Sequence, residues 1–224
     1  MTSSTVQPWP WARTREVGAP GAPVWARQAN ACSNSIAIFA KSGSLVVPYN
    51  GSTMTFQDLL AASGRAPEIP EAADVYGWLT GSWDLDVHHY AGMKVDLKGE
   101  AHFAWVLEGR AVQDVWIMPR DRGLVGDVAY LGKNMFGTTL RVWDASIQAW
   151  RISWVNPVSM HREEQIGRRS GADVMQVGCR YDGTPTRWSF TEITADSFHW
   201  LGEALQADGK TWRLEGEFRA RRRG

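Results

Sequence analysis

Two neighbouring segments near the middle of the chain, residues 95–107 and 111–118, alternate between hydrophobic and polar positions. This alternation is typical of strands with one buried face, and Glu108-Gly109 between them is a turn signal. A two-residue turn there places Trp105 opposite Val112, Phe103 opposite Asp114 and Ala101 opposite Trp116. The shared face then carries large apolar groups and a single carboxylate, Asp114, which favours a barrel wall that encloses something.

Turn signals separate further strand-like segments at intervals of roughly ten residues, with no helical pattern between them. The predicted strands are residues 80–90, 94–107, 111–118, 124–131, 137–143, 148–156, 172–181, 186–193, 198–206 and 210–220. This spacing predicts an all-β protein, an antiparallel up-and-down β-barrel of about ten strands.

A short amphipathic helix is predicted immediately before the first strand. Thr55 suits the N-cap position, and Asp58 follows three residues later, close to a capping box. The apolar residues after the cap share one face: Phe56, Leu59 and Leu60. Gly64 is a natural residue to end the helix. A helix of this size is expected to plug one end of the barrel.

Residues 1–53 differ from the rest of the chain. They contain one acidic residue, Glu16, several prolines and no sustained hydrophobic period. We expect a flexible or loosely docked extension, followed by a barrel domain over residues 54–224. Two explanations stay open for it. Either Met54 is the natural start of the protein, which we favour, or the apolar residues between 36 and 47 dock the extension on the barrel.

The order of a short helix, Gly81-Ser82-Trp83 at the start of the first strand, and an up-and-down meander resembles the lipocalin and fatty-acid-binding superfamily. More closely, it resembles bacterial lipocalin-like barrels that are distant relatives of the nitrobindins. The resemblance covers about residues 54–220. In lipocalins this tryptophan closes the bottom of the barrel beneath a late arginine. The resemblance therefore implies that Trp83 lies beneath Arg219 or Arg221.

Three further turns predict which polar side chains face inward, because a turn determines the register of its two strands. Around Asp182-Gly183 the opposed pairs are Val177 with Trp188 and Met175 with Phe190. Around Asp208-Gly209 they are Leu205 with Trp212, Glu203 with Leu214 and His199 with Phe218. The loop at residues 194–197 pairs Glu192 with His199 and Phe190 with Leu201. All three registers place His199, Glu203 and Glu192 on the inner face, where Asp114 joins them.

A less regular turn between Trp143 and Trp150 is expected to give one more inner face. It carries Arg141, Trp150, Ile152, Trp154 and Asn156. Convergent polar groups among aromatic rings are the usual make-up of a small-molecule pocket. A buried pair of Arg141 with Asp114 has both a structural and a functional interpretation, and the sequence leaves the two open.

These faces define the candidate site residues. The expected ligand-binding side chains are Trp105, Trp116, Arg141, Trp154, Asn156 and Glu192. The expected catalytic groups, if the protein is an enzyme, are Asp114 and Glu203 with assistance from His199. Carboxylates desolvated by aromatic rings suit general acid–base chemistry near neutral pH.

Composition narrows the possible partners. The chain has 13 tryptophans among 224 residues, which favours a rigid aromatic interior, and its formal net charge is zero. We therefore expect no general attraction to nucleic acid or to an anionic membrane. Cys32 and Cys179 show no metal-ligand spacing, and no apolar run approaches the length of a membrane span. With no secretory signal at the start, a cytoplasmic monomer or homodimer is expected.

Three functions remain open at this point. The leading hypothesis is a binding module that holds a small aromatic or apolar molecule, without a cofactor or metal. The alternative is a barrel enzyme, an isomerase, cyclase, hydratase or lyase that uses the inner carboxylates. A third hypothesis is haem binding through His199, since an inward histidine is the minimum that such a site needs.

The first prediction concerns the extension. A chain shortened to begin at Met54 should keep the melting temperature and ligand behaviour of the full chain, because removal of undocked residues costs almost nothing. Differential scanning calorimetry of both chains measures this. A loss of several degrees would show that the extension docks on the barrel.

Overall fold

A computed structural model describes residues 55–119 and 135–224 of the chain. Within these ranges the chain forms one short α-helix, Phe56–Leu60 (α2), and two 3-10 turns, Glu71–Ala73 (η3) and Gly77–Leu79 (η4). The ten strands there are Gly81–Tyr90 (β1), Met93–Val106 (β2), Ala111–Met118 (β3), Met135–Asp144 (β4), Ala149–Asn156 (β5), His161–Ser170 (β6), Asp173–Arg180 (β7), Pro185–Thr191 (β8), Ser197–Leu205 (β9) and Trp212–Arg222 (β10). The predicted extension at residues 1–53 lies outside the described residues.

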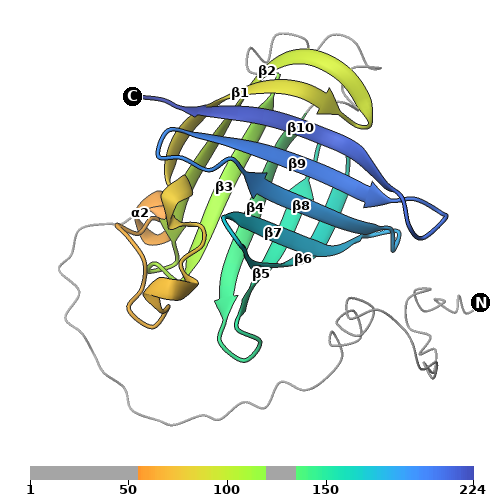
Figure 1. The fold of residues 1–224 in the computed structure, drawn as a ribbon. Coiled ribbons are helices and arrows are strands. Elements are labelled where there is room, and N and C mark those ends of the chain that lie inside the picture. The colour runs from red at the N-terminus through yellow and green to blue at the C-terminus, as the bar shows by residue number, and fades with distance from the viewer. Residues whose placement is uncertain (1–54, 120–134) are drawn as a thin grey trace, which may run out of the picture. The chain divides into compact units, whose positions relative to one another are not determined.

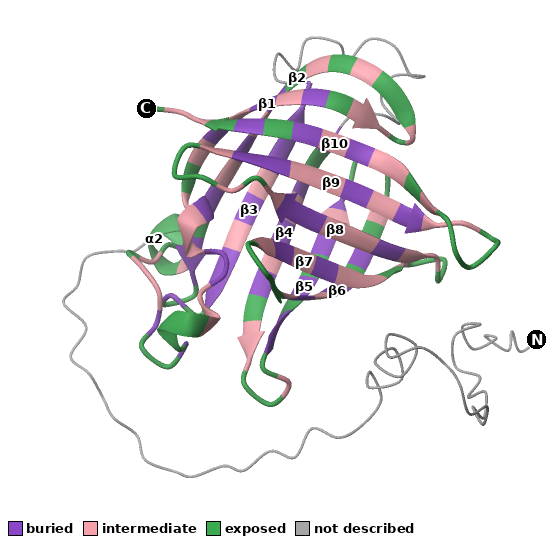
Figure 2. Cartoon of the chain, viewed as in Figure 1, coloured by how far each residue is buried: buried purple, intermediate pink, exposed green. Residues whose placement is uncertain are grey.

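The strands form a closed antiparallel barrel (Figure 1). Each strand pairs with the next along the chain, and β1 pairs with β10 to complete the ring. Side chains alternate between the interior and the outer surface, and Figure 2 shows this as bands of buried and exposed residues along the strands. The predicted all-β, up-and-down barrel is therefore confirmed. Closure of the ring pairs every one of these ten strands on both sides.

Two differences concern the list of strands. The strand predicted at residues 124–131 lies outside the described residues. The β6 strand was not predicted, because its inward-facing side chains are mostly polar. They are His161, Glu163, Gln165 and Gly167. An apolar alternation therefore never arises along this strand.

Two hairpin registers are as predicted. In β2 and β3, Trp105 lies opposite Val112 and Phe103 lies opposite Asp114. In β4 and β5, Arg141 lies opposite Ile152, and the predicted inner face of β5 is buried. These two hairpins bring Asp114 and Arg141 into the interior on adjacent strands.

The register of β7 and β8 differs from the prediction by one residue. Arg180 N–H donates to the Thr184 carbonyl at 3.0 Å, so the loop has three residues, 181–183, instead of two. Gly183, with φ of +85°, takes the left-handed position that such a loop needs. As a result Gln176, not Val177, lies opposite Trp188. A shift of one residue exchanges the two faces of a strand, so Gln176 is inside.

The register of β9 is also corrected. Near the turn, Leu205 pairs with Trp212 and Glu203 with Leu214, as predicted. Between Leu214 and Gly216 the register shifts, and beyond this bulge Phe218 pairs with Trp200. Across the other edge of β9 Phe190 also pairs with Trp200, not with Leu201. The inner face of β9 therefore carries even-numbered residues, and the inward positions predicted for His199 and Glu203 were wrong.

The plug of the barrel is not the α-helix. Thr55 caps α2 in a complete capping box with Asp58, as expected, but Phe56 and Leu59 are 71% and 61% exposed. The chain then leaves the helix and runs beside the β2–β3 loop, where Ala62 N–H donates to the Trp105 carbonyl. The residues that fill this end of the barrel come later in the chain, from η3, η4 and their flanks: Ile69, Val75, Tyr76 and Leu79.

Trp83 closes the same end of the barrel. Its side chain is fully buried, and its indole N–H donates to the Leu79 carbonyl at 2.7 Å. The guanidinium of Arg222 lies over the ring at 4.1 Å from the centroid and donates to the carbonyls of Trp78 and Thr80. The arginine implied by the resemblance is therefore Arg222, which lies opposite Trp83 in the β1–β10 register, and not Arg219 or Arg221.

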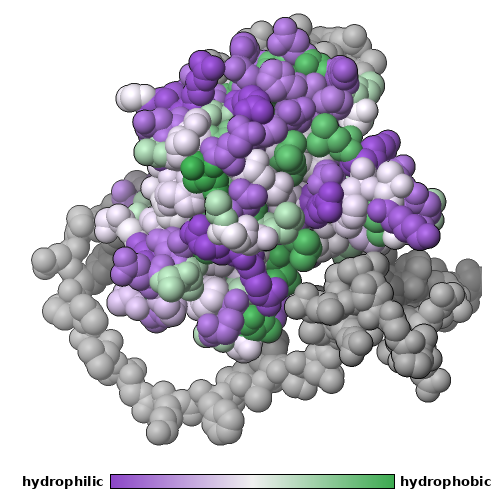
Figure 3. Space-filling model, viewed as in Figure 1, coloured by the Kyte–Doolittle hydropathy of each residue, from purple (hydrophilic) through white to green (hydrophobic). Residues whose placement is uncertain are grey.

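The outer surface of the barrel is largely polar. Figure 3 shows hydrophilic side chains over much of one face, with hydrophobic groups in small scattered areas. In the described part of the chain, no helix is long and apolar enough to cross a membrane.

Replacement of Trp83 with alanine should destabilise the barrel by about 3–5 kcal/mol, because it removes a large buried ring and leaves Arg222 without its aromatic partner. Urea unfolding measures the change. Tyr181→Ala, at a ring that is 75% exposed, is the matched control and should change stability little. Equal midpoints for both variants would contradict the assigned role of Trp83.

Candidate functional site

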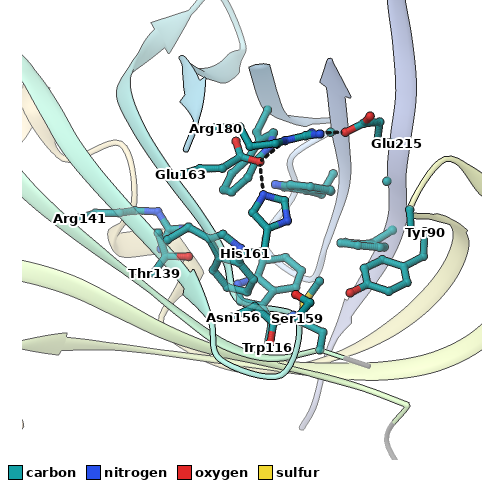
Figure 4. A pocket seen from close by; sticks show the side chains of 18 residues that line it. Tyr90, Trp116, Thr139, Arg141, Asn156, Ser159, His161, Glu163, Arg180 and Glu215 are labelled. Carbon is teal, nitrogen blue, oxygen red and sulfur yellow. Dashed lines mark hydrogen bonds and ion pairs between the residues drawn. The ribbon is translucent and has the colours of Figure 1, made fainter. Parts of the chain in front are cut away.

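A cavity of about 180 Å³ lies inside the barrel at the end opposite the plug. The segments at its mouth include the β1–β2 and β5–β6 connections, whereas the plug contacts the β2–β3 connection. In an up-and-down barrel these two sets of connections lie at opposite ends. Figure 4 shows side chains from several strands that converge on this space.

Aromatic rings make up a large part of the cavity wall. The tryptophan, phenylalanine and tyrosine rings there are Tyr90, Trp116, Trp154, Trp188, Trp200 and Phe218. Trp200 and Phe218 stack with centroids 4.7 Å apart and planes inclined by 6°, and Trp188 contacts Trp200 at 5.5 Å. The wall is thus a continuous cluster of rings that support one another.

Trp200 lies close against the sheet because two glycines lie beneath it. Gly202 and Gly216 face each other on β9 and β10, and both line the cavity. A Cβ atom on either glycine would be too close to the ring of Trp200. The missing side chains therefore leave the space that the ring of Trp200 occupies.

A buried ion pair forms the floor of the cavity. Arg141 Nη1 donates to Asp114 Oδ2 at 2.6 Å, and both side chains are almost fully buried. The backbone N–H of Thr139 donates to the other carboxylate oxygen at 2.7 Å. Arg141 also lies over the ring of Tyr76 from the plug, at 5.1 Å. With its partners in place, the carboxylate of Asp114 is directed at Arg141 and not at the open space.

Hydrogen bonds continue this floor along β6 and β7. Gln176 Oε1 accepts from the Tyr76 hydroxyl at 3.0 Å and from Arg141 Nε at 3.4 Å. Gln176 Nε2 in turn donates to Gln165 Oε1 at 3.2 Å. Burial raises the pKa of Tyr76 above its ordinary value, so its hydroxyl remains a donor. Gly167 leaves the room that this hydroxyl occupies.

The network ends at Glu163 beside the cavity. Its side chain is 1% exposed, and it accepts from Thr186 Oγ1 at 2.6 Å and from Gln165 Nε2 at 3.3 Å. His161 Nε2 lies 2.7 Å from the other carboxylate oxygen. Arg180 lies 3.7 Å from the same oxygen and also pairs with Glu215 (Figure 4).

The mouth of the cavity carries the hydroxyl group of Tyr90. Tyr90 lines the cavity, and burial raises its pKa to about 12, so the hydroxyl stays protonated across the physiological range. Asn156 also lines the cavity, and its side-chain oxygen accepts from the backbone N–H groups of Val158 at 3.2 Å and Phe136 at 3.4 Å. Asn156 therefore shapes the β5–β6 turn at the rim.

The structure brings part of the predicted site together. Trp116, Arg141, Trp154 and Asn156 all line the cavity. Asp114 lies directly behind Arg141 and is absent from the lining. Trp105 is buried in the core and packs on Trp150 at 6.2 Å, outside the cavity wall.

Three predicted residues lie away from the cavity. Glu203 pairs with Arg187 on the outer face at 2.6 Å and 2.9 Å. His199 also faces outward, with Nε2 3.0 Å from Glu217. Glu192 is 62% exposed and pairs with Arg219, whose hydrogen bond lowers the pKa of the glutamate. The bulge in β10 accounts for the outward positions of Glu203 and His199, whereas Glu192 lies just past the end of β8 with φ of +50°. Glu203 and His199 therefore do not face the interior, where an acid–base role had been predicted for them.

The polar residues of β6 and β7 in and behind the cavity wall were not predicted from the sequence. His161, Glu163 and Arg180 line the cavity, and Gln165 and Gln176 belong to the hydrogen-bond network behind it. The alternation typical of a strand is present at His161, Glu163 and Gln165, but the residues that face inward are polar instead of hydrophobic. The bulge in β10 also places Glu215 in the cavity lining, a position that the sequence analysis did not anticipate.

No cluster of three or more metal-ligating side chains occurs among residues 55–119 and 135–224. The haem hypothesis rested on an inward His199, and that position was wrong. Comparison of the chain with models of protein families and with curated proteins gives no match. The function of the site must therefore be inferred from its own geometry.

The buried ion pair predicts that Asp114 contributes much more to stability than Glu203. Asp114→Asn should cost about 3–5 kcal/mol of stability, because it leaves the Arg141 guanidinium buried without its counter-charge. Glu203→Gln breaks a partly exposed pair and should cost less than about 1 kcal/mol. Guanidinium chloride unfolding of both variants measures the two effects. Similar losses would show that the Asp114 pair contributes no more than a surface pair.

Proposed function

We propose that this protein binds a small aromatic or apolar molecule in the cavity of the barrel. The observation that carries the proposal is a cavity of about 180 Å³, open at its mouth, whose lining includes a cluster of tryptophan rings. A concave site with many aromatic groups and a few polar groups suits a small apolar molecule, because burial of apolar surface is favourable.

The size of the cavity limits the ligand. An apolar cavity of about 150 Å³ is sufficient for benzene. The cavity here is slightly larger and therefore suits one aromatic ring with a few substituents. Offset and edge-to-face contacts with Trp188, Trp200 and Phe218 would each add affinity to the burial of the ring.

The resemblance to lipocalin-like barrels supports the same proposal. A closed ten-strand barrel, a plugged end with Trp83 beneath an arginine, and a cavity at the far end are the features that such a binder needs. We propose that the chain is a distant member of this group. Its specific relation to the nitrobindins is part of the proposal.

Calorimetric titration with toluene tests the function. The protein should bind toluene with saturation, and native mass spectrometry of the gently purified protein should show a retained small molecule. Trp188→Ala should weaken toluene binding about two- to tenfold, the loss of one aromatic contact of roughly 0.5–1.5 kcal/mol.

Trp212→Ala is the matched control. Trp212 lies on the outer face beneath Arg187, outside the cavity lining, so its loss should leave toluene affinity unchanged. Absence of binding by any single-ring compound in the unaltered protein would overturn the proposed function.

A further inference from the structure

The imidazole of His161 has one nitrogen bound and the other open to the cavity. Nε2 lies 2.7 Å from Glu163 Oε1, and this is the one hydrogen bond that joins the ring to residues 55–119 and 135–224. The side chain is 33% exposed, and it lines the cavity. Figure 4 shows the ring between Glu163 on one side and the space next to Tyr90 on the other.

The neighbours of Glu163 decide which nitrogen carries the proton. Gln165 Nε2 donates to Thr186 Oγ1 at 3.1 Å, and Thr186 Oγ1 donates to Glu163 at 2.6 Å. Glu163 is thus surrounded by donors and acts as an acceptor. Its contact with His161 therefore requires a proton on Nε2. In the neutral imidazole the other nitrogen, Nδ1, then has a free lone pair that faces the cavity.

The charges around the cavity disfavour an anionic ligand. Arg141 is paired with Asp114, and Arg180 is paired with Glu215 and lies 3.7 Å from Glu163. Both guanidinium groups of the lining therefore already have carboxylate partners. A bound carboxylate would have to compete with these partners, whereas a neutral molecule would not.

We propose that the cavity selects a neutral, single-ring compound with a hydroxyl group, a phenol, whose O–H donates to Nδ1 of His161. This inference rests on the proposed function and specifies the class of ligand. The ring would occupy the tryptophan-lined space, and the hydroxyl would satisfy an acceptor that the surrounding network of described residues leaves open. Glu163 acts as a positioning residue, since it holds the proton on Nε2 and so keeps Nδ1 available.

Calorimetric titrations with phenol, toluene, anisole and benzoate test the assignment. Phenol and toluene have the same number of heavy atoms and differ in the donor. The preference for phenol over toluene should fall about two- to tenfold in His161→Phe, the effect of one lost hydrogen bond. Anisole, which has an ether oxygen but no donor, should show no such change. Benzoate should bind more weakly than phenol.

His199→Phe is the matched control, because His199 makes a similar contact with Glu217 on the outer face of the barrel. It should leave the preference for phenol unchanged. His161→Gln, whose side-chain carbonyl is also an acceptor, should restore part of the preference and provides a second variant if His161→Phe does not fold.

Nitrogen-15 NMR of the unaltered protein gives an independent result. The His161 ring should show the Nε2–H tautomer, and phenol, but not toluene, should shift the Nδ1 resonance. Glu163→Gln should change the tautomer populations and reduce the preference for phenol, an effect that a purely structural role would not produce.

The outcomes separate the two proposals. If none of the four compounds binds, both the proposed function and this inference are overturned. If toluene binds but the phenol preference survives in His161→Phe, or if the free ring carries its proton on Nδ1, only this inference is overturned. Tighter binding of benzoate than of phenol would overturn the choice of a neutral ligand.

Discussion

The ion pair between Asp114 and Arg141 is the interaction on which the interior of the barrel depends. A buried charge pair is stable only when each remaining donor and acceptor finds a partner, because unsatisfied groups are costly at low dielectric. Arg141 Nε therefore donates to Gln176, and Gln176 in turn donates to Gln165 and accepts from the Tyr76 hydroxyl. The polar inner faces of β6 and β7 follow from this one pair.

This network also separates the barrel into two parts. Towards the plug, Tyr76, Trp83 and their neighbours pack as a solid aromatic core. Towards the mouth, the rings of Trp116, Trp154 and Trp200 leave an open space. The layer of Arg141 and Gln176 lies between the two, and its hydrogen bonds hold both Tyr76 and the cavity floor in place.

The sequence predicted the fold well but the site only in part. Alternation and turn signals were sufficient for the closed barrel and for the hairpins that carry Asp114 and Arg141. The inner and outer faces were assigned wrongly where a single extra residue changed the register. The two places are a three-residue loop at 181–183 and a bulge between Leu214 and Gly216. Neither feature has a signal that distinguishes it from a two-residue turn or a regular strand. Because the strand period is two, each error exchanged interior for exterior.

The polar inner face of β6 explains why His161 and Glu163 were missed. Their strand is recognised only if polar residues are allowed to face inward, and nothing in the local sequence indicates the network that they join. Its other members, Arg141 and Gln176, lie on β4 and β7, and only the folded barrel brings them near β6. A site built from satisfied polar groups is thus harder to predict from hydrophobic patterns than the aromatic wall beside it.

The opposed glycines beneath Trp200 have a consequence for how such a barrel can evolve by substitution. Gly202 and Gly216 allow the indole to lie against the sheet, in a nearly parallel stack with Phe218. A methyl group at either position would come within 2.5 Å or 2.8 Å of the ring and force a shift. One carbon atom therefore decides how closely the indole can lie against the sheet, and with it the shape of the cavity wall. The cavity can be remodelled by a single substitution, without any change in the order of the strands.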